Sequence, residues 1–465
     1  MLKPLFYPVF LILFIAAAGG TARGQMQWVP MGQGVPCIAE SAAALNDTLY
    51  VASFCGFTSG TLHYWDGAHW TAADSFTTQQ HPNLHSLHTH NGALYLAGYF
   101  EDINNLPGTK CIAKYTDRGW AALKNGFEGS GLPRVTSQAT YNGQLYVGGS
   151  FSGIDGRNLR HLVRWNGTGW DSLVPPFSGY INAMAVYQGE LYIAGQFDSL
   201  AGLPLVDIAR FDGSAWHPVG NGLQSENPTD EVAELALWNN DLVAYGGFDS
   251  VNGQPCKGFA LWDGTQWRPL GTDTMTVVTL PSAMVGTDSL LYAGGYDIQR
   301  GGSAPNSRNL SVWDGERWQP VGQPLNGSIL DLFPSDSGIV ALGYFDSAGT
   351  APMPHVARLT GSLAPVSRAE SIHQASFTVN VSPNPSATRW QVQVVHSSAA
   401  SPKGCSLQLY DLNGRLLRQY PATPLRGSAT EVEISAEGLP GGVYFLRIQV
   451  EDEMHFQRLL RTNRP

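Results

Sequence analysis

Four acidic residues occupy matching positions along the sequence and could together bind a cation. Glu101, Asp198, Asp249 and Asp346 each follow the Phe of a recurring motif. Carboxylate oxygens are ligands that hard cations prefer, so four of them around one opening would form a metal site. The favoured alternative is structural, because an Asp in an Asp-Ser-x-x-Gly segment caps its own turn.

A group of histidines offers a second set of metal ligands. His85, His88 and His90 lie in one short segment, and imidazole nitrogen is a common zinc ligand. In a strand, His88 and His90 share one face while His85 takes the other, so the segment alone does not converge on one ion. Solvated loop and edge histidines are the favoured interpretation, and no cofactor is expected.

The sequence contains no familiar catalytic motif. Gly-x-Ser-x-Gly, His-Glu-x-x-His and a phosphate-binding loop do not occur. If the chain is an enzyme acting on polysaccharide, the candidates are residues that depart from the repeat, namely His85, Asp297 and Arg300. Such an enzyme needs an acid and a base about 5 to 10 Å apart. A noncatalytic protein is the preferred expectation, and no catalytic residue is assigned.

The five cysteines cannot all pair with one another. Cys37 and Cys55 lie in the first repeat, so one possibility is a local disulfide between them. Cys111 and Cys256 fall in repeats that are not neighbours and are expected to stay apart. No pair has Cys-x-x-Cys spacing, which argues against a metal or redox motif.

These residues are positioned by a repeat of roughly 50 residues, a period typical of propeller blades. In most repeats an apolar run leads to Gly and Phe and then to a Trp-Asp-Gly-x-x-Trp signal or a variant of it, such as Trp-Asn-Gly or Phe-Asp-Gly. Asp-Gly and Asn-Gly pairs between the runs predict tight hairpins, and hence four strands per repeat. The sequence predicts an all-β fold, a seven-bladed β-propeller with four-stranded blades. The apolar runs begin at Leu49, Leu94, Leu145, Leu191, Leu242, Leu291 and Ile339.

The two ends of the repeat array complement each other. The last repeat stops at Thr360-Gly361 without its second Trp, and residues 28–32 copy the missing piece as it stands at 216–220. An open ring would leave two unpaired strand edges, so the N-terminal strand is predicted to close the last blade. Longer loops should gather on one face, where we expect any binding surface. These loops are residues 101–110, 152–160, 198–206, 249–257, 297–308 and 346–354.

The pattern Leu-Tyr-x-x-Gly-x-Phe followed by Ala-Arg-Trp-Asp-Gly-x-x-Trp resembles the kelch-like propellers of secreted bacterial proteins. The resemblance covers residues 26–361. It departs from kelch because a strict Gly-Gly pair is absent from some repeats, as at Ala52-Ser53 and Ala97-Gly98. The resemblance implies the propeller fold and selects no function.

Two further segments flank the repeats. Residues 1–25 hold Lys3, an apolar run and then small residues, which predicts a secretory signal peptide. The run is shorter than the roughly 20 residues of a membrane span, so no transmembrane segment is expected in the mature chain. After the repeats we expect a linker at 362–375 and a small Ig-like β-sandwich at 376–465.

The tail carries three short motifs and a basic end. They are Asn384-Pro385, Asn413-Gly414-Arg415, Gly442-Val443-Tyr444 and residues 457–461. In this pattern the tail resembles the C-terminal sorting domain of the type IX secretion system, a Por secretion system type A tail. The resemblance implies recognition by the translocon and delivery through the periplasm to the cell surface or the medium.

Composition narrows the possible partners. The formal net charge is -10, with 27 Lys plus Arg against 37 Asp plus Glu, so nucleic acid is not an expected partner. The preferred hypothesis is an exported, noncatalytic binding or adhesion propeller whose long-loop face binds a glycan or a protein. One alternative is a secreted carbohydrate-active enzyme with its site at the channel mouth. Another is a passive structural protein of the cell envelope.

Overall fold

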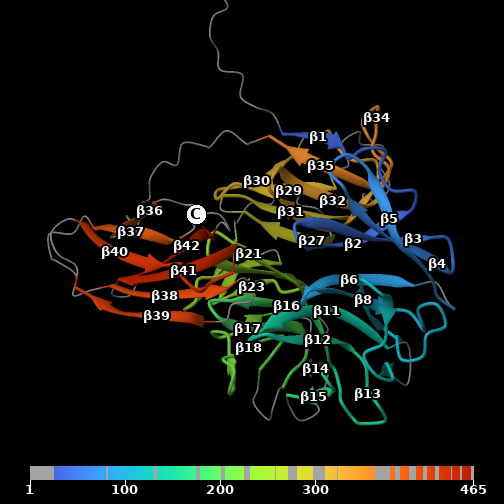
Figure 1. Ribbon diagram of the computed structural model, residues 1–465, viewed down its shortest axis with the longest axis horizontal. Helices are drawn as coiled ribbons and strands as arrows, with labels where there is room; N and C mark the ends of the chain where they lie inside the picture. Colours follow the sequence, from blue (N-terminus) through green and yellow to red (C-terminus); the bar gives the residue numbers. More distant parts are fainter. Residues whose placement is uncertain are drawn as a thin grey trace, which may run out of the picture.

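In the computed structural model, every regular element of the described residues is a β-strand (Figure 1). The described residues are 26–79, 82–129, 133–173, 179–199, 205–224, 231–256, 258–270, 280–287, 289–296, 309–321, 323–361, 377–382, 388–396, 405–411, 416–424, 429–440, 442–450 and 453–461. The predicted signal peptide, 1–25, and linker, 362–375, lie outside these ranges.

None of the described residues forms a helix with the length and apolar character that crossing a bilayer requires.

Seven four-stranded antiparallel sheets follow one another through the described part of residues 26–361. We number them sheets 1 to 7 in chain order. Sheet 1 holds β2 (Ile38–Leu45), β3 (Thr48–Cys55), β4 (Ser59–Trp65) and β5 (Trp70–Thr77); sheet 2 holds β6 (Asn83–His90), β7 (Ala93–Tyr99), β8 (Ile112–Thr116) and β9 (Gly119–Ala121); sheet 3 holds β11 (Arg134–Tyr141), β12 (Gln144–Ser150), β14 (Leu162–Trp165) and β15 (Trp170–Ser172). Sheet 4 holds β16 (Tyr180–Tyr187), β17 (Glu190–Gln196), β18 (Ile208–Phe211) and β19 (Trp216–Pro218); sheet 5 holds β21 (Val232–Trp238), β22 (Asp241–Gly246), β25 (Phe259–Trp262) and β26 (Trp267–Pro269); sheet 6 holds β27 (Leu280–Gly286), β28 (Leu291–Tyr296), β29 (Leu310–Trp313) and β30 (Trp318–Pro320).

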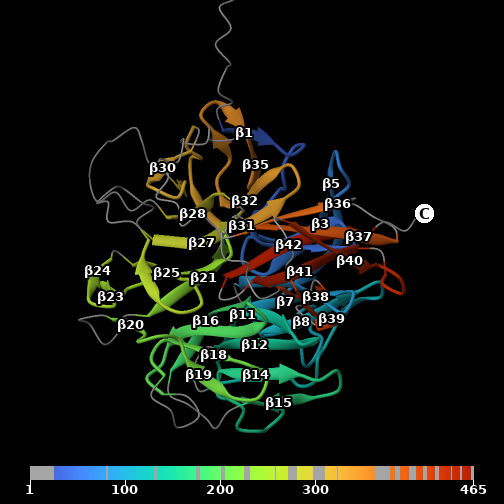
Figure 2. The ribbon, with the colours of Figure 1, turned by 90° about the vertical axis from the view of Figure 1, so that its left-hand side faces the viewer.

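Sheet 7 combines the two ends of the repeat array. It holds β31 (Ser328–Ser335), β32 (Gly338–Tyr344), β35 (Val356–Thr360) and, as its fourth strand, β1 (Gln27–Pro30). β1 runs antiparallel to β35, and Figures 1 and 2 show the two side by side. Trp28 stands opposite Leu359 in this pairing.

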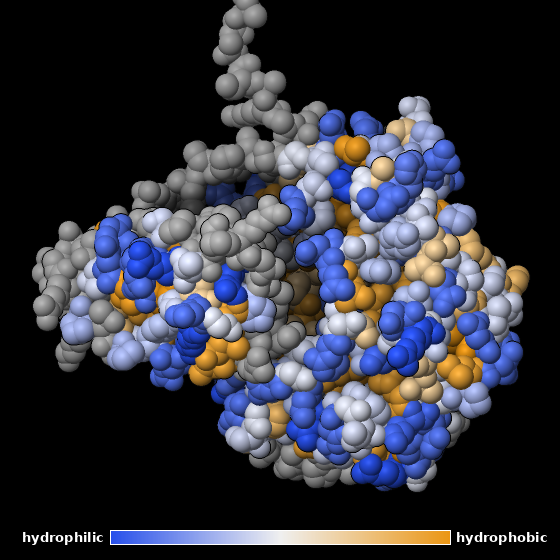
Figure 3. Space-filling view, in the orientation of Figure 1, coloured by the Kyte–Doolittle hydropathy of each residue, from blue (hydrophilic) through white to orange (hydrophobic). Residues whose placement is uncertain are grey.

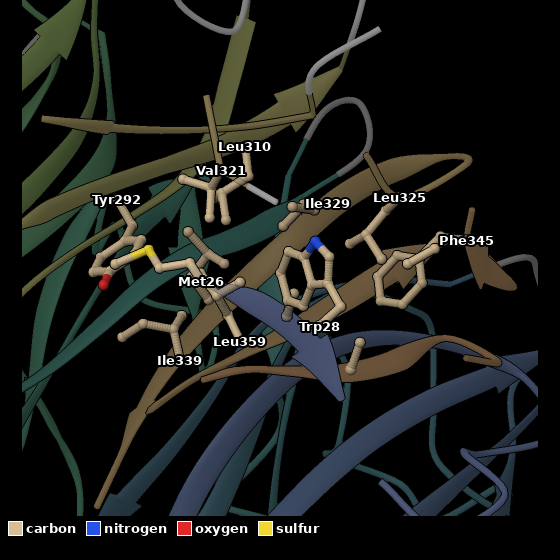
Figure 4. Close-up of a cluster of buried hydrophobic side chains, with 14 of the residues drawn as sticks. Met26, Trp28, Tyr292, Leu310, Val321, Leu325, Ile329, Ile339, Phe345 and Leu359 are labelled. Carbon is tan, nitrogen blue, oxygen red and sulfur yellow. The ribbon is translucent and has the colours of Figure 1, made fainter. Parts of the chain in front are cut away.

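The side chains of β1 are part of a hydrophobic core. Met26 and Trp28 are 5% and 8% exposed. Figure 4 shows the Trp28 indole among side chains of sheets 6 and 7, close to Ile329, Leu325 and Phe345. β1 therefore contributes buried apolar surface as well as backbone hydrogen bonds.

The first strands of successive sheets contact one another in a cyclic order. β2 contacts β6, and the series continues through β11, β16, β21, β27 and β31, which itself contacts β2. Figure 1 shows these strands around a common centre, and Figure 3 shows a hollow at that place. The hydrogen-bonded sheets stay separate, so side chains make the connections between them.

The recurring Asp-Gly signal forms the turn between the third and fourth strands of a sheet. In sheet 4, Asp212 Oδ1 accepts hydrogen bonds from the backbone N–H of Ser214 and Ala215, at 2.7 and 2.8 Å. Gly213 follows with φ of 101°, a backbone region that favours glycine. The two residues that flank this turn, Phe211 and Trp216, pack together with their ring centroids 5.0 Å apart. This Asp therefore has a structural role.

The longer loops are tied to the segments that link one sheet to the next. β10 (Phe127–Glu128) pairs with β13 (Gly153–Ile154), and β20 (Leu223–Gln224) pairs with β23 (Ser250–Val251), which pairs in turn with β24 (Gln254–Pro255). β33 (Ser347–Ala348) pairs with β34 (Ala351–Pro352), and Leu325 bridges to Ala348. In these three cases link and loop therefore lie at the same end of the sheets, and part of the loop is fixed by backbone pairing.

Cysteine geometry separates one pair from the rest. Cys37 and Cys55 form a disulfide with their Cα atoms 5.0 Å apart, a usual separation for such a bond. The bond joins the segment before β2 to the end of β3. Cys111, Cys256 and Cys405 are free and buried.

The tail forms two antiparallel sheets that share one hydrophobic core. One sheet holds β36 (Phe377–Ser382), β37 (Arg389–His396) and β40 (Ala429–Ser435); the other holds β39 (Leu416–Thr423), β38 (Cys405–Asp411), β41 (Gly442–Val450) and β42 (Glu453–Arg461). Trp390 and Ile434 of the first sheet and Leu446 of the second are fully buried in this core.

Candidate functional site

Each of the seven first strands contains a β-bulge at the same position. One residue there has no partner in the register with the second strand, and a bulge of this kind re-aims a side chain. A Cβ at Gly195, on the second strand of sheet 4, would overlap the carbonyl oxygen of Tyr180 beside the bulge, which explains the glycine of the repeat motif. The bulge residues are Glu40, His85, Thr136, Asn182, Ala233, Ser282 and Leu330.

Bulge side chains hydrogen-bond to the backbone of the next sheet. Four of these bonds connect equivalent positions in successive sheets, and they explain how separate sheets are held in order. The bonds are Leu84 N–H to Glu40 Oε2 at 2.8 Å, Thr136 Oγ1 to Ile181 O at 2.5 Å, Asn182 Nδ2 to Val232 O at 3.1 Å and Ser282 Oγ to Ile329 O at 2.7 Å.

Sheets 7 and 1 are joined by a carboxylate. Asp331 Oδ2 accepts hydrogen bonds from the Ser41 hydroxyl at 3.1 Å and from the Ala42 backbone N–H at 2.9 Å. Ser41 Oγ accepts in turn from the Leu87 N–H of sheet 2, at 2.9 Å. The contact therefore extends over three sheets on the side of the first strands.

Four polar residues gather where three of the first strands begin, and we call them the polar arc: Arg134, Tyr180, Asn182 and Glu231. The Arg134 guanidinium lies over the Tyr180 ring, 5.8 Å from its centroid. The Tyr180 hydroxyl and the Asn182 amide both donate to Glu231 Oε2, at 2.8 and 3.0 Å. The arc thus combines an aromatic face, a cation and a fixed carboxylate from sheets 3, 4 and 5.

The surroundings keep two neighbouring groups in defined protonation states. Burial and the Glu231 carboxylate, as hydrogen-bond partner and as charge, raise the pKa of Tyr180 to about 12. His85 reaches solvent, but the protein atoms around it leave its imidazole poorly solvated. Together with the charge of Arg134, this lowers the pKa of His85 to about 4. Near neutral pH Tyr180 is therefore a hydrogen-bond donor, and His85 is uncharged.

A buried carboxyl makes the stability depend on pH. Glu40 is 8% exposed, and burial raises its pKa from 4.5 to about 7. Because folding disfavours the ionised form of Glu40, the contribution of this residue to stability is most favourable below pH 4.5, falls as the pH rises towards 7 and is level above it. We expect Glu40→Gln to raise the free energy of unfolding by about 3 kcal/mol at pH 8 and by little at pH 4.5. Urea unfolding at both pH values measures this, and an equal change at both would contradict it.

The acidic residues predicted to act together are engaged separately. Glu101 forms an ion pair with Lys110 at 2.8 Å, and Asp346 Oδ1 accepts from the Asn326 amide at 2.6 Å. The Asp198 carboxylate accepts a hydrogen bond from the Ser199 hydroxyl. At Asp249 the backbone carbonyl oxygen accepts a hydrogen bond from the Cys256 N–H. Asp297 and Arg300 lie outside the described residues. Within the described ranges, no three His, Cys, Asp or Glu side chains are arranged to hold a metal ion.

The histidines of β6 are used in hydrogen bonds between sheets. His88 Nε2 and His90 Nδ1 lie 2.8 and 3.0 Å from the Thr140 hydroxyl oxygen on β11. His85 takes no part in this contact among the described residues. His88 and His90 thus already share a partner that is not a metal.

A Ser–His pair that the sequence does not reveal occurs in sheet 1. Ser53 Oγ lies 3.2 Å from His63 Nδ1. Ser53 is fully buried and His63 is 5% exposed, so a substrate cannot reach the hydroxyl. The pair therefore has a packing role.

The sorting motifs fall partly in the described tail. Gly442, Val443 and Tyr444 begin β41. Tyr444 is buried, donates its hydroxyl to Pro440 O at 2.5 Å and packs against Trp390 with ring centroids 6.2 Å apart. The other motif residues, Asn384, Pro385, Asn413, Gly414 and Arg415, lie outside the described residues.

Comparison with known families identifies the tail. Residues 380–461 match the family described as the secretion system C-terminal sorting domain, which is the Por secretion tail. The tail is a type IX secretion sorting domain. This sorting domain marks the chain for handling by the type IX secretion system and for export to the cell surface or the extracellular space.

Three solved structures show a distant likeness to this chain. PorZ, an essential bacterial surface component of the type IX secretion system of Porphyromonas gingivalis, is 15% identical with a TM-score of 0.43; the match covers 90% of this chain and 59% of PorZ. YjhT is 12% identical with a TM-score of 0.34, over 72% of this chain and 97% of YjhT. Dimeric latent PorU from P. gingivalis is 9% identical with a TM-score of 0.19, over 95% of this chain and 34% of PorU. No curated protein matches. Likeness this low transfers no function.

Proposed function

We propose that sheets 1 to 7 are the blades of one kelch-like, seven-bladed β-propeller spanning residues 26–361, with β1 closing the last blade. The cyclic contacts of the first strands and the pairing of β1 with β35 support this architecture. In this proposal residues 1–25 are a signal peptide and 362–375 are a linker. Residues 376–465 form the sorting sandwich, which contains the matched segment 380–461.

We further propose that the exported propeller is a noncatalytic binding or adhesion protein whose ligand, a glycan or a protein, sits at the channel mouth. The polar arc carries this proposal. Three neighbouring sheets present an exposed guanidinium, an aromatic ring and a fixed carboxylate at the end where the loops lie. An aromatic ring beside a few well-placed polar groups is typical of ligand-binding sites.

The test is a binding screen of the purified full chain against polysaccharides and surface-protein extracts, with hydrolysis measured in parallel. We expect at least one specific ligand whose affinity falls about tenfold or more in Tyr180→Ala. The reason is that the ring of Tyr180 supports Arg134 and its hydroxyl holds Glu231 in place. Tyr64→Ala, a half-buried tyrosine of β4 outside the arc, is the matched control and should leave the affinity unchanged.

The screen also separates the two alternatives. A secreted carbohydrate-active enzyme is favoured by Glu234, whose pKa is raised to about 8 by burial and by the charge of Asp331, since a protonated carboxyl can act as a general acid. Turnover of any polymer that Glu234→Gln abolishes would establish the enzyme and reject the binding role. Absence of both binding and turnover would favour a passive envelope protein.

A further inference from the structure

We propose that the polar arc binds a carboxylate-bearing saccharide, with the Arg134 guanidinium holding the carboxylate of an acidic sugar. The inference rests on the proposed function and adds the chemical class of the ligand. It depends on three properties of the arc. Arg134 is a cation without an ion-pair partner, Glu231 is an oriented acceptor, and the Tyr180 ring lies beside both.

Arg134 is an exposed cation whose guanidinium is free of ion pairs with the described carboxylates. Its guanidinium carbon lies 5.8 Å from the centroid of the Tyr180 ring, within cation–π range, so the ring favours this position of the side chain beside Glu231. A planar fork held in this way can donate two parallel hydrogen bonds to a carboxylate.

Glu231 provides the complementary acceptor. Its Oε2 is held by Tyr180 and Asn182, while Oε1 receives no hydrogen bond from the described residues. A fixed carboxylate with one available oxygen is a good acceptor for a ligand hydroxyl. A sugar ring that bears both a carboxylate and hydroxyls therefore suits Arg134 and Glu231 together.

The charge of the chain favours a saccharide over an acidic peptide. The net charge is -10, and the arc offers one cation beside its own carboxylate, so a run of acidic side chains would be repelled. A sugar with a single carboxylate avoids this repulsion, and its hydroxyls can donate to Glu231.

The test uses two probes that differ in a single carboxylate: monomeric galacturonate and its methyl ester. Titration calorimetry on the full chain should give an affinity about 10- to 100-fold higher for the acid, the range expected of hydrogen bonds to a charged group. Arg134→Gln should remove this preference, and Arg134→Lys should restore only part of it because the fork is lost. Arg268→Gln is the matched control, since it removes an equal charge from an ion pair with Asp241 on sheet 5.

Each other outcome contradicts a specific step. Equal affinity for acid and ester, or equal effects of Arg134→Gln and Arg268→Gln, overturns the acidic-sugar inference. If neutral saccharides still depend on Tyr180, that result leaves the proposed function standing. If polyglutamate binds, its binding depends on Arg134 and no saccharide binds, the assignment of the ligand as a saccharide is overturned. Failure of every saccharide and surface protein to bind rejects the proposed function itself.

Discussion

A chain that begins at residue 32 should unfold about 10 °C or more below one that begins at residue 26. The deletion removes the whole of β1, so the backbone of β35 becomes an exposed edge. It also removes Met26 and Trp28 from the core of sheets 6 and 7. Truncation to Ala costs about 3 to 5 kcal/mol for one buried Trp and about 2 to 5 kcal/mol for one buried Met, and about 2 °C accompanies each kcal/mol in a domain of this size. Calorimetry of the two chains measures the difference.

Two further variants make this result specific. Gln27→Ala, at an exposed position of β1, should leave the unfolding temperature unchanged. Moving residues 28–34 to a position directly after residue 363 should recover most of the loss, because the fourth strand would then follow β35 through a hairpin as in the other sheets. An unchanged unfolding temperature after the deletion would mean that β1 contributes nothing to closing sheet 7.

Deleting residues 376–465 should abolish delivery to the cell surface and the medium. The sorting domain lies entirely in the deleted segment, while the core clusters of sheets 1 to 7 contain none of its residues. We therefore expect a folded product that stays inside the outer membrane. Fractionation of a bacterium with a type IX secretion system should show a fall of at least about tenfold in the exported protein, well beyond the effect of a typical destabilising change.

Single substitutions test whether export requires a folded tail. Trp390 is fully buried between the two tail sheets, so Trp390→Ala should unfold the tail and reduce export. Leu416 is 44% exposed, and Leu416→Ala should leave both unchanged. Fusion of residues 362–465 to a reporter should confer export, and export of the chain that lacks its tail would reject the role of the domain.

Local chemistry made much of the fold predictable. An Asp such as Asp212 caps a turn within four residues, and the following Gly213 supplies the required backbone angle. These effects need no distant partner, so the hairpins and the all-β class could be read from the repeat. The copy of the fourth-strand motif around Trp28 likewise pointed to pairing between the two ends of the repeats.

The candidate site was less predictable because it joins residues from different repeats. A bulge adds one residue to a strand and leaves no mark in the composition, so the importance of positions such as Asn182 was not apparent. Arg134, Tyr180 and Glu231 meet only because sheets 3, 4 and 5 are neighbours. Superimposing the repeats on the bulge position would have revealed where their chemistry differs. The acidic residues chosen instead have local partners, as Glu101 has in Lys110.

The pairing of Gln27 with Thr360 also sets the order of assembly. Each of sheets 1 to 6 uses strands from one stretch of chain and can form as soon as that stretch is available. Sheet 7 needs both ends, and closure over such a distance is slow because the entropy of a long loop must be overcome first. The pairing of β1 with β35 becomes possible only when the chain has been synthesised to residue 360. The matched sorting domain begins shortly afterwards, at residue 380. The export signal is therefore synthesised after every strand of the seven sheets that it exports.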